Sequence, residues 1–301
     1  MITRREMLRG SLALGGAAML APHLAPHLSA AAVTVPEERN ITEQLGWQIG
    51  PQIYSFSRFP FDEALKMVVA CGTATFEQYP GQRVSRDINV GVGPDLLRAE
   101  NREHLKRVKD LLEESGCSMN AFGVCGAGKA DFDFCAEFNI PLLNTEPGFD
   151  RIAGVSQLAE EYKIKVGLHN HPHNSIYWYP EIVLAQLRDA SPLMGACADT
   201  GHWHRSLLDP LACIKRLKGR IVSFHIKDLK GIGVGFNADC VLGQGDVGIE
   251  AVLKEFATHD TKDPIPFSIE FEADWDRNQP KVAESVKYFD SVAKSIAAAR
   301  G

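Results

Sequence analysis

Four apolar segments in the second half of the chain end in ionisable side chains. They read VGLHNH, GACAD, IVSFHIKD and FSIEFE. Successive side chains of a β-strand point to opposite faces, so residues two apart share a face. In each segment the side chains on one face are apolar. The other face carries ionisable side chains only near its C-terminal end. The ionisable residues are His169, His171, Asp199, His225, Lys227 and Glu270.

These residue types are ligands for one divalent metal ion. Carboxylate oxygens with imidazole nitrogen suit Mn, Mg, Co or Zn. Such an ion can hold two neighbouring oxygens of a sugar and stabilise the enediolate formed when an α-proton leaves. A nearby carboxylate or neutral histidine then serves as the base, and His169 and His171 are the candidates for acid/base work. The plainer interpretation is a solvated strand end whose histidines do no chemistry.

Strand-like and helix-like segments alternate from about residue 47 and would position these side chains. Eight strand candidates begin with WQIGPQIYSF and end with PFSIEFEADW, and amphipathic helical patterns lie between them. The alternation predicts an α/β fold, a (β/α)8 TIM barrel with its active site at the C-terminal strand ends. An open doubly wound sheet is the rival. We expect one barrel domain over residues 47–301, preceded by a lead-in at 33–46.

Five motifs, taken in order, give the chain a family resemblance. LHNHPH, ADTGHW, HIKDL, GQGDVGIEAVL and SIEFE resemble the sugar phosphate isomerase/epimerase family, the xylose-isomerase-like TIM barrels, and within it the branch near the inosose dehydratases. The resemblance covers about residues 47–295. It implies a metal ion held by Glu, Asp, His and Glu from successive strand ends. Asp199, His225 and Glu270 match three of these ligands.

The fourth ligand departs from the family pattern. Members that epimerise free ketoses carry a metal-binding Glu where this chain has His169. Either His169 binds the metal, or Glu146 of LLNTEP reaches in from the preceding strand. We favour Glu146, because a third anionic ligand better balances a hard cation. The departure also weakens a direct transfer of ketose 3-epimerase activity.

Four further residues are candidates for contact with the substrate. Lys227 should hold an oxyanion or protonate a leaving group, unless it forms a salt bridge with a neighbouring carboxylate. Glu77 would bind sugar hydroxyls or make a structural hydrogen bond inside the barrel. His202 and Trp203 would cover the sugar or pack within their loop.

Neighbouring polar residues receive structural interpretations. We expect Asn170 to turn toward the helices and Glu272 to be solvated. The loop GQGDVG lacks the spacing of a phosphate-binding motif, so we expect Asp246 to cap the following helix. Seven cysteines without a C-x-x-C pair are interpreted mostly as buried thiols, and no disulfide is predicted.

The leading hypothesis is an exported, metal-dependent isomerase or epimerase of a sugar, keto-sugar or cyclitol. Proton abstraction next to a carbonyl would start the reaction. The same site could act as a lyase or dehydratase of a keto-sugar or inosose, an outcome favoured by the replaced Glu and the HNH pattern. A non-catalytic periplasmic sugar-binding protein and a metal-dependent endonuclease are two further hypotheses. The net charge of −6 argues against a nucleic-acid partner, and the oligomeric state stays open, a homo-oligomer included.

The first 32 residues have the layout of an export signal. Arg4 and Arg5 precede a Gly/Ala/Leu run and then small residues. The stretch TRREMLR resembles a twin-arginine motif, which predicts a periplasmic location. The apolar run is too short and glycine-rich to span a bilayer comfortably, so no membrane anchor should remain after cleavage.

Cleavage can be measured directly. We expect protein isolated from the periplasm to lack residues 1–32, because the small residues around Ala32 form the cleavage region. Intact-mass spectrometry gives the mature N-terminus. Periplasmic protein that retains Met1 would contradict a cleaved signal.

Overall fold

Eight parallel strands form the main sheet of the protein. The computed structural model describes residues 37–300, with side chains from Ile41 onward, so the predicted signal peptide lies outside the described residues. The strands are β1 (Trp47–Pro51), β2 (Thr75–Gln78), β5 (Ser118–Cys125), β6 (Leu142–Thr145), β7 (Lys165–His169), β8 (Met194–Asp199), β9 (Ile221–Ile226) and β12 (Ile265–Ile269).

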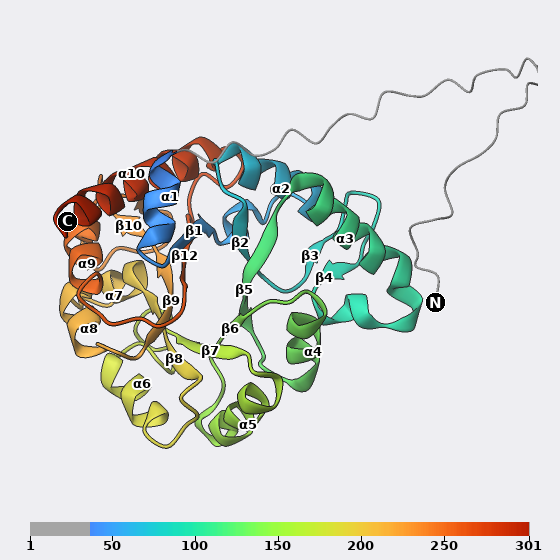
Figure 1. The fold of residues 1–301 in the computed structure, drawn as a ribbon, viewed down its shortest axis with the longest axis horizontal. Helices are drawn as coiled ribbons and strands as arrows, with labels where there is room; N and C mark the ends of the chain where they lie inside the picture. The colour runs from blue at the N-terminus through green and yellow to red at the C-terminus, as the bar shows by residue number, and fades with distance from the viewer. Residues whose placement is uncertain (1–36, 301) are drawn as a thin grey trace, which may run out of the picture. The chain divides into compact units, whose positions relative to one another are not determined.

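The strand order makes a nearly closed barrel. It runs β1-β12-β9-β8-β7-β6-β5-β2, and every neighbouring pair is parallel. A single bridge between Gln52 and Glu77 joins the two end strands, β1 and β2. Figure 1 shows the strands in the middle of the fold with the helices around them. The predicted TIM barrel is confirmed.

Helices alternate with the strands as predicted. The α-helices are α1 (Glu37–Gln44), α2 (Phe61–Ala70), α3 (Arg102–Ser115), α4 (Lys129–Glu137), α5 (Ile152–Tyr162), α6 (Pro180–Leu187), α7 (Thr200–Arg205), α8 (Pro210–Arg216), α9 (Ile249–Phe256) and α10 (Gln279–Ala298). Short 3-10 helices are η1 (Ile53–Phe56), η2 (Pro94–Leu97), η3 (Ala99–Asn101) and η4 (Phe149–Arg151). None of the helices between residues 37 and 300 has the length and apolarity to cross a membrane.

The apolar strand faces pack against the helices. Phe224 of β9 and Phe267 of β12 stack with 4.4 Å between ring centroids, and Phe256 of α9 meets both rings. Phe289 of α10 lies 4.9 Å from Phe267. All four rings are buried. The sequence predicted one apolar face for each of these strands. In the structure, that face packs against the surrounding helices.

The opposite strand faces fill the barrel with polar side chains. Glu77 accepts hydrogen bonds from Asn144 Nδ2 at 2.9 Å and Ser268 Oγ at 2.6 Å. Ser223 Oγ in turn donates to Asn144 Oδ1 at 2.8 Å. All four residues are almost completely buried. A hydrogen-bonded layer thus supports the strand ends from below, as buried polar groups require.

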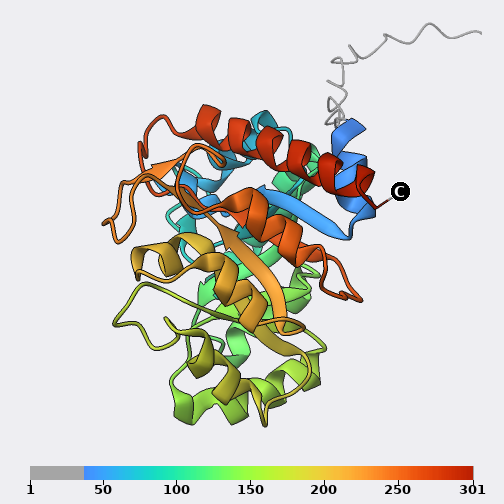
Figure 2. The ribbon, with the colours of Figure 1, turned by 90° about the vertical axis from the view of Figure 1, so that its left-hand side faces the viewer.

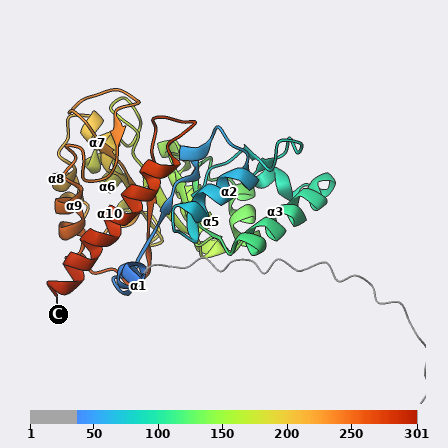
Figure 3. The ribbon, with the colours of Figure 1, turned by 90° about the horizontal axis from the view of Figure 1, so that it is seen from above.

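The lead-in at 33–46 contains a helix that packs on the last one. Thr42 Oγ1 of α1 donates to Asp290 Oδ1 of α10 at 2.8 Å, and both side chains are buried. Figures 2 and 3 show α1 beside the C-terminal half of α10. This contact ties the start of the described chain to its end.

Two short hairpins leave the barrel at its C-terminal side. They are β3 (Gln82–Arg83) with β4 (Gly91–Val92), and β10 (Asp228–Leu229) with β11 (Asp239–Cys240). The carboxylate of Asp228 accepts from the backbone N–H of Gly243 and Gly245, at 2.8 and 3.0 Å, and so holds the GQGDVG loop.

The predicted cap of the helix after this loop is wrong. Helix α9 begins after Gly248, whose φ of 78° lies in the left-handed region, and no side chain caps it. Asp246 lies two residues before this N-cap position, and it instead accepts from the backbone N–H of Gly231 at 2.7 Å. The cysteine prediction is confirmed, since all seven thiols are free and buried.

The close approach of β1 and β2 at Gly50 leads us to expect that a larger side chain there destabilises the protein. A Cβ added at Gly50 would lie 1.9 Å from the backbone oxygen of Thr75, so Gly50→Ala must push the strands apart. We expect a loss of about 1–3 kcal/mol, as for overpacked sites. Gly154→Ala is the control, because Gly154 is exposed in α5 with no atom within 4 Å of the added carbon. That change should stabilise by about 0.5–1 kcal/mol.

Thermal and urea unfolding of the two variants measure the difference. A Gly50→Ala variant that unfolds like the wild type would contradict the close approach of the strands.

Candidate active site

A cavity of about 400 Å³ lies at the C-terminal ends of the barrel strands. Its wall contains aromatic, aliphatic and amide residues together with ionisable side chains. The lining residues are Gln52, Tyr54, Tyr79, Pro80, Gly123, Val124, His169, His171, Phe236, Glu270 and Glu272. Three of the predicted site residues, His169, His171 and Glu270, therefore meet at one opening.

Four side chains from neighbouring strand ends converge beside this cavity. His169, Asp199, His225 and Glu270 each offer one ligand atom, and these atoms lie within 4.8 Å of one another. His169 Nε2 lies 3.5 Å from Asp199 Oδ2, and His225 Nδ1 lies 3.1 Å from Glu270 Oε2. All four residues are buried. Three are the residues that the sequence predicted, and the fourth is His169.

The tautomer of His225 follows from its partner deeper in the barrel. Its Nε2 lies 2.9 Å from the carboxylate of Glu77, which is the hydrogen-bond acceptor. A neutral imidazole that donates from Nε2 keeps a lone pair on Nδ1, and that atom faces Asp199 and Glu270. Metal-binding histidines in proteins commonly make such a hydrogen bond to a carboxylate. Of the two predicted roles of Glu77, the geometry favours the structural hydrogen bond inside the barrel.

Glu146 orients two histidines at once. Its Oε1 lies 3.1 Å from His169 Nδ1 and 2.7 Å from His171 Nδ1, and it also accepts from the backbone N–H of His171. Burial alone would raise the pKa of Glu146, but the two histidines lower it to about 2. The carboxylate is therefore ionised, and it leaves the Nε2 atom of each ring free to accept.

The structure does not bring Glu146 into the converging set, although the sequence favoured it as the fourth ligand. Its carboxylate contacts the far side of the His169 ring, and His169 itself presents Nε2 to Asp199. The physical reason is the set of bonds that Glu146 makes. His169 Nδ1, His171 Nδ1 and the His171 N–H hold its carboxylate on the far side of the His169 ring.

Asn170 fixes Asp199 to the neighbouring strand. Its side-chain amide donates to the Asp199 carbonyl at 3.0 Å and accepts from the Asp199 N–H at 2.8 Å. The prediction that Asn170 turns toward the helices is corrected, because these two bonds continue the β7–β8 pairing beyond the end of β7. Asp199 Oδ1 accepts from His202 N–H at the start of α7, which leaves Oδ2 for the site.

Lys227 lies behind the carboxylates rather than along the cavity wall. Its Nζ lies 2.7 Å from Asp199 Oδ2 and 2.6 Å from Glu270 Oε2, and its side chain is fully buried. Burial lowers the pKa of Lys227, but the charges of Asp199 and Glu270 outweigh it and raise the pKa above its usual value. This geometry favours the salt bridge over a direct role on the substrate.

A glycine makes room for the lysine. A Cβ at Gly201 would lie 2.6 Å from Lys227 Cβ and 3.0 Å from its Cδ. The stem of Lys227 therefore runs against the bare backbone of α7. Its ammonium is a built-in counter-ion for the two carboxylates.

The donor set fits a divalent cation. His169 Nε2 is completely buried and has no hydrogen-bond partner among the described residues. Burial and His225 lower the pKa of His169, yet the nearby carboxylates of Asp199 and Glu146 raise it to about 9. Burial also lowers the pKa of His225, while Cys197, Glu77 and Glu270 raise it well above its usual value. The carboxylates thus favour positive charge at this point beyond the charge of Lys227, and a proton or a metal ion can supply it.

Glu272 corrects a sequence expectation. The sequence predicted a solvated side chain, but Arg205 Nη1 donates to its Oε2 at 2.6 Å and only 7% of the residue is exposed. Arg205 Nη2 also donates to Asp239 at 2.6 Å, and the Phe236 ring covers the guanidinium 4.8 Å away. The Arg205 charge is therefore shared by two carboxylates beside the cavity.

The two predicted cover residues lie behind the wall. Trp203 is 1% exposed and belongs to the hydrophobic core. His202 is equally buried, and its Nε2 lies 3.2 Å from Lys227 Nζ. The structure therefore favours the packing role for both residues over contact with a sugar. Helix α7 starts at the strand end and turns these rings inward.

Sequence reasoning missed the aromatic wall of the cavity. Tyr54 and Tyr79 follow the ends of β1 and β2, so their place after two strands was a usable signal. Phe236 comes from the glycine-rich loop between β10 and β11, and no pattern in that loop pointed to the site. Arg205 was also missed, since nothing in HWHR marks it as a partner of Glu272.

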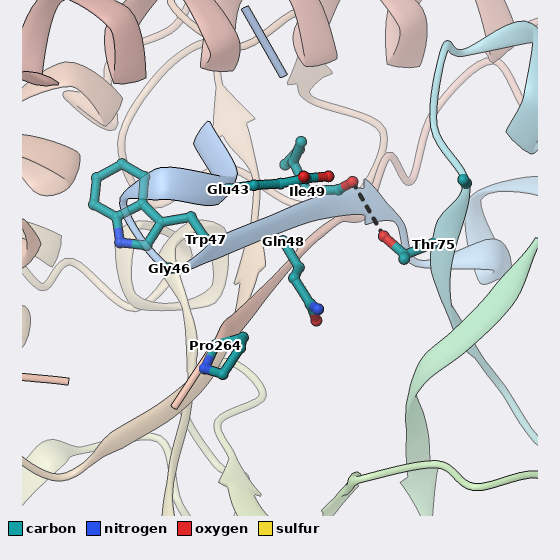
Figure 4. Close-up of a pocket in the computed structure, with 8 residues that line it drawn as sticks. Glu43, Gly46, Trp47, Gln48, Ile49, Thr75 and Pro264 are labelled. Carbon is teal, nitrogen blue, oxygen red and sulfur yellow. Dashed lines mark hydrogen bonds between the residues drawn. The ribbon is translucent and has the colours of Figure 1, made fainter. Parts of the chain in front are cut away.

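A second cavity lies at the other end of the strands. Figure 4 shows the cavity of about 340 Å³ lined by Glu43, Trp47, Gln48 and Thr75, at the N-terminal ends of β1 and β2. Thr75 Oγ1 donates to the Ile49 carbonyl at 3.4 Å there. In TIM barrels this end contributes to stability, and the strand ends that carry chemistry are the opposite ones. The site at the C-terminal mouth remains the candidate.

Solved structures share this architecture. An uncharacterised protein from Parabacteroides distasonis is 26% identical, with a TM-score of 0.63 over 82% of this chain and 99% of that one. A D-tagatose 3-epimerase-like protein is 16% identical, with a TM-score of 0.64 over 84% and 100%. The IolI protein with a bound zinc atom is 15% identical, with a TM-score of 0.60 over 83% and 98%. A search of curated proteins finds no significant match.

The sequence itself matches one family model over most of its length. The match covers residues 52–292, from directly after β1 into the C-terminal half of α10, and so includes the whole converging set. The order of motifs, the barrel and the strand-end site agree with this match. The chain belongs to the xylose isomerase-like TIM barrel family.

Proposed function

We propose that this protein is a metal-dependent sugar isomerase or epimerase that removes a proton next to a carbonyl. One observation carries the proposal. His169, Asp199, His225 and Glu270 converge within 4.8 Å, immediately beside a cavity that His171 also lines. Proton abstraction from a keto-sugar needs a cation that polarises the carbonyl and a base beside it. A cation site next to an oriented imidazole provides both groups.

The metal would be held by His169 Nε2, Asp199 Oδ2, His225 Nδ1 and Glu270 Oε2. When bound, a divalent ion at this point polarises a carbonyl and stabilises negative charge on the neighbouring oxygen. The bond between His225 and Glu77 orients one ligand, and the bond between His169 and Glu146 orients another. Lys227 keeps Asp199 and Glu270 ionised and in place.

His171 is the proposed base. Its side chain is 43% exposed, so a substrate can reach the ring. Its Nδ1 lies 2.7 Å from the ionised Glu146, which therefore accepts its proton and leaves Nε2 free to take one. A carboxylate that orients an imidazole base and stabilises its charged form is a recurring arrangement in enzymes. Return of a proton to the opposite face of the same carbon would complete an epimerisation, and return to the adjacent carbon would complete an isomerisation.

A lyase or dehydratase is the second candidate, and the identity of His169 favours it. A neutral imidazole here replaces the anionic Glu of ketose epimerases, so the site holds one negative charge fewer. The same deprotonation by His171 would then end with departure of a β-oxygen, which the protonated imidazole could protonate. Both reactions begin with the same proton abstraction. Deuterium exchange followed by NMR distinguishes their second steps, reprotonation and elimination.

We also propose export to the periplasm by the twin-arginine route. Arg4, Arg5 and the small residues near Ala32 support it. Export of folded protein would let the metal ion be inserted before transport.

Deuterium exchange tests the proposed reaction and its base. Loaded with Mn, Co or Zn, the protein should exchange a carbon-bound proton of a keto-sugar or inosose in D2O, followed by NMR. His171→Ala should slow exchange by about 10²–10⁴-fold, since that is the usual contribution of a general base. His173→Ala is the control, because His173 is exposed beyond Pro172 and should change exchange less than about threefold.

Exchange without a new product means reversible proton abstraction, and lost water means elimination. Unchanged exchange in His171→Ala would remove His171 as the base. If no deuterium exchange occurred with any of the metals and substrates, the proposed reaction would be contradicted.

Metal content tests the ligand assignment. His169→Ala should lose the ion on dialysis, because it removes one of four ligand atoms. Glu146→Gln should retain near-stoichiometric metal yet turn over more slowly, by about tenfold or more, because the orientation of His171 is lost. Inductively coupled plasma mass spectrometry gives the content of each variant. The opposite pattern, metal lost only in Glu146→Gln, would make Glu146 the ligand.

A further inference from the structure

One buried thiol lies next to the converging set and has no role in the proposed reaction. Of the seven free cysteines, Cys197 alone belongs to a group of potential ligands among the described residues. It lies in β8 two residues before Asp199, so both side chains face into the barrel. Cys197 is 1% exposed and does not line the cavity. The thiol therefore lies deeper in the barrel than the carboxylate of Asp199.

Two histidines bring this thiol into a second group of ligand atoms. His169, Cys197 and His225 each offer one such atom, and the three atoms lie within 4.8 Å of one another. We call these three residues the thiol set. In the sheet, His169 pairs with Cys197 across β7 and β8, and His225 follows on β9. An ion with bonds of about 2.0–2.3 Å holds ligand atoms roughly 3.5–4 Å apart, a spacing that small side-chain shifts would reach.

A glycine on the neighbouring strand allows the thiol to lie close to His169. A Cβ at Gly167 of β7 would lie 2.9 Å from Cys197 Cβ, so a larger residue there would push the two apart. Gly167 and His169 are two residues apart and share the inward face of β7. His169 Nδ1 contacts Glu146, whereas His169 Nε2 is buried without a hydrogen-bond partner among the described residues. That nitrogen is the atom left for a ligand.

The thiol set differs in chemistry from the converging set. The converging set includes the carboxylates of Asp199 and Glu270, which Lys227 Nζ contacts at 2.7 and 2.6 Å. An ion bound there has a positive charge beside its ligands. The thiol set contains neither of these carboxylates. Sulfur with imidazole nitrogen suits soft cations, whereas carboxylates suit hard ions such as Mg and Mn.

We propose that the thiol set is a second cation position, selective for a soft, thiolate-preferring cation, and that its occupation excludes an ion from the converging set. Binding forms a metal–sulfur bond and releases the thiol proton to solvent. A soft cation held at this position would lie away from the cavity, and it would therefore inhibit the proposed reaction.

The exclusion follows from the shared histidines. Both positions use His169 and His225, and one ring nitrogen of each already contacts a carboxylate. His169 Nδ1 contacts Glu146, and His225 Nε2 contacts Glu77. Each ring thus has one nitrogen left, which can bind one ion at a time. The exclusion rests on the metal site of the proposed function, whereas binding at the thiol set does not.

Cadmium binding tests the thiol set. Stoichiometric Cd²⁺ added to the metal-free protein should produce the ultraviolet charge-transfer absorption of a cadmium–thiolate bond. Cys197→Ser should remove this absorption and weaken Cd²⁺ binding at least about a hundredfold, because loss of a ligand should exceed loss of an outer-shell partner. Cys213→Ser is the matched control and should keep both properties. Cys213 is buried in α8 and belongs to no group of potential ligands among the described residues.

Manganese binding and thermal unfolding show whether a variant keeps its fold. Mn²⁺ affinity, measured by electron paramagnetic resonance, should change less than about threefold in Cys197→Ser, since a hard ion gains little from sulfur. Cys197→Ala should behave in the same way, and it has no side-chain oxygen to replace the sulfur. A wild-type protein without the thiolate absorption, or an absorption that persists in both Cys197 variants, would overturn the proposal.

Competition in the wild-type protein tests the exclusion. Cd²⁺ added to the Mn²⁺-loaded protein should displace an equal amount of Mn²⁺ and stop deuterium exchange. Mn²⁺ that stays bound while the cadmium–thiolate absorption develops would contradict the exclusion. If the Mn²⁺-loaded protein catalysed no exchange although Cd²⁺ bound through Cys197, the proposed reaction would fail and the thiol set would stand.

Discussion

Buried negative charge is the constraint on which the site depends. Glu77, Glu146, Asp199, Glu270 and Glu272 all end within one strand mouth, and each has lost most of its contact with water. Isolated carboxylates in such surroundings would protonate. Four of them stay ionised because each has a partner: Lys227 for Asp199 and Glu270, and imidazoles for Glu77 and Glu146. Glu272 forms an ion pair with Arg205. The histidine tautomers, the position of Asp199 and the direction of Lys227 all follow from this pairing.

The barrel and three site residues could be predicted from sequence because alternation places them. Asp199 and His225 lie at the inner-face positions of their strands, and Glu270 directly follows β12, so strand geometry alone brings them together. The roles of Glu146 and Lys227 could not be read in this way. The role of each side chain depends on which partner across the barrel holds the opposite charge, and sequence position does not reveal that partner. Asp246 shows the same limit, since a turn at Gly231 competed with the helix for its carboxylate.

The aromatic wall shows how distant segments share one surface. Tyr54, Tyr79 and Phe236 come from loops after β1, after β2 and between β10 and β11, so no local pattern links them. In a TIM barrel such loops can change without disturbing the strands below. The aromatic wall in the loops can therefore vary separately from the ionisable residues at the strand ends.

The amide of Asn170 has a consequence for the proposed metal site. Because the Asn170 side chain pairs with both backbone groups of Asp199, it ties the end of β8 to the residue that follows β7. In the proposed metal site, His169 and Asp199 would therefore lose little conformational entropy when an ion binds, and the affinity would depend mainly on charge and desolvation.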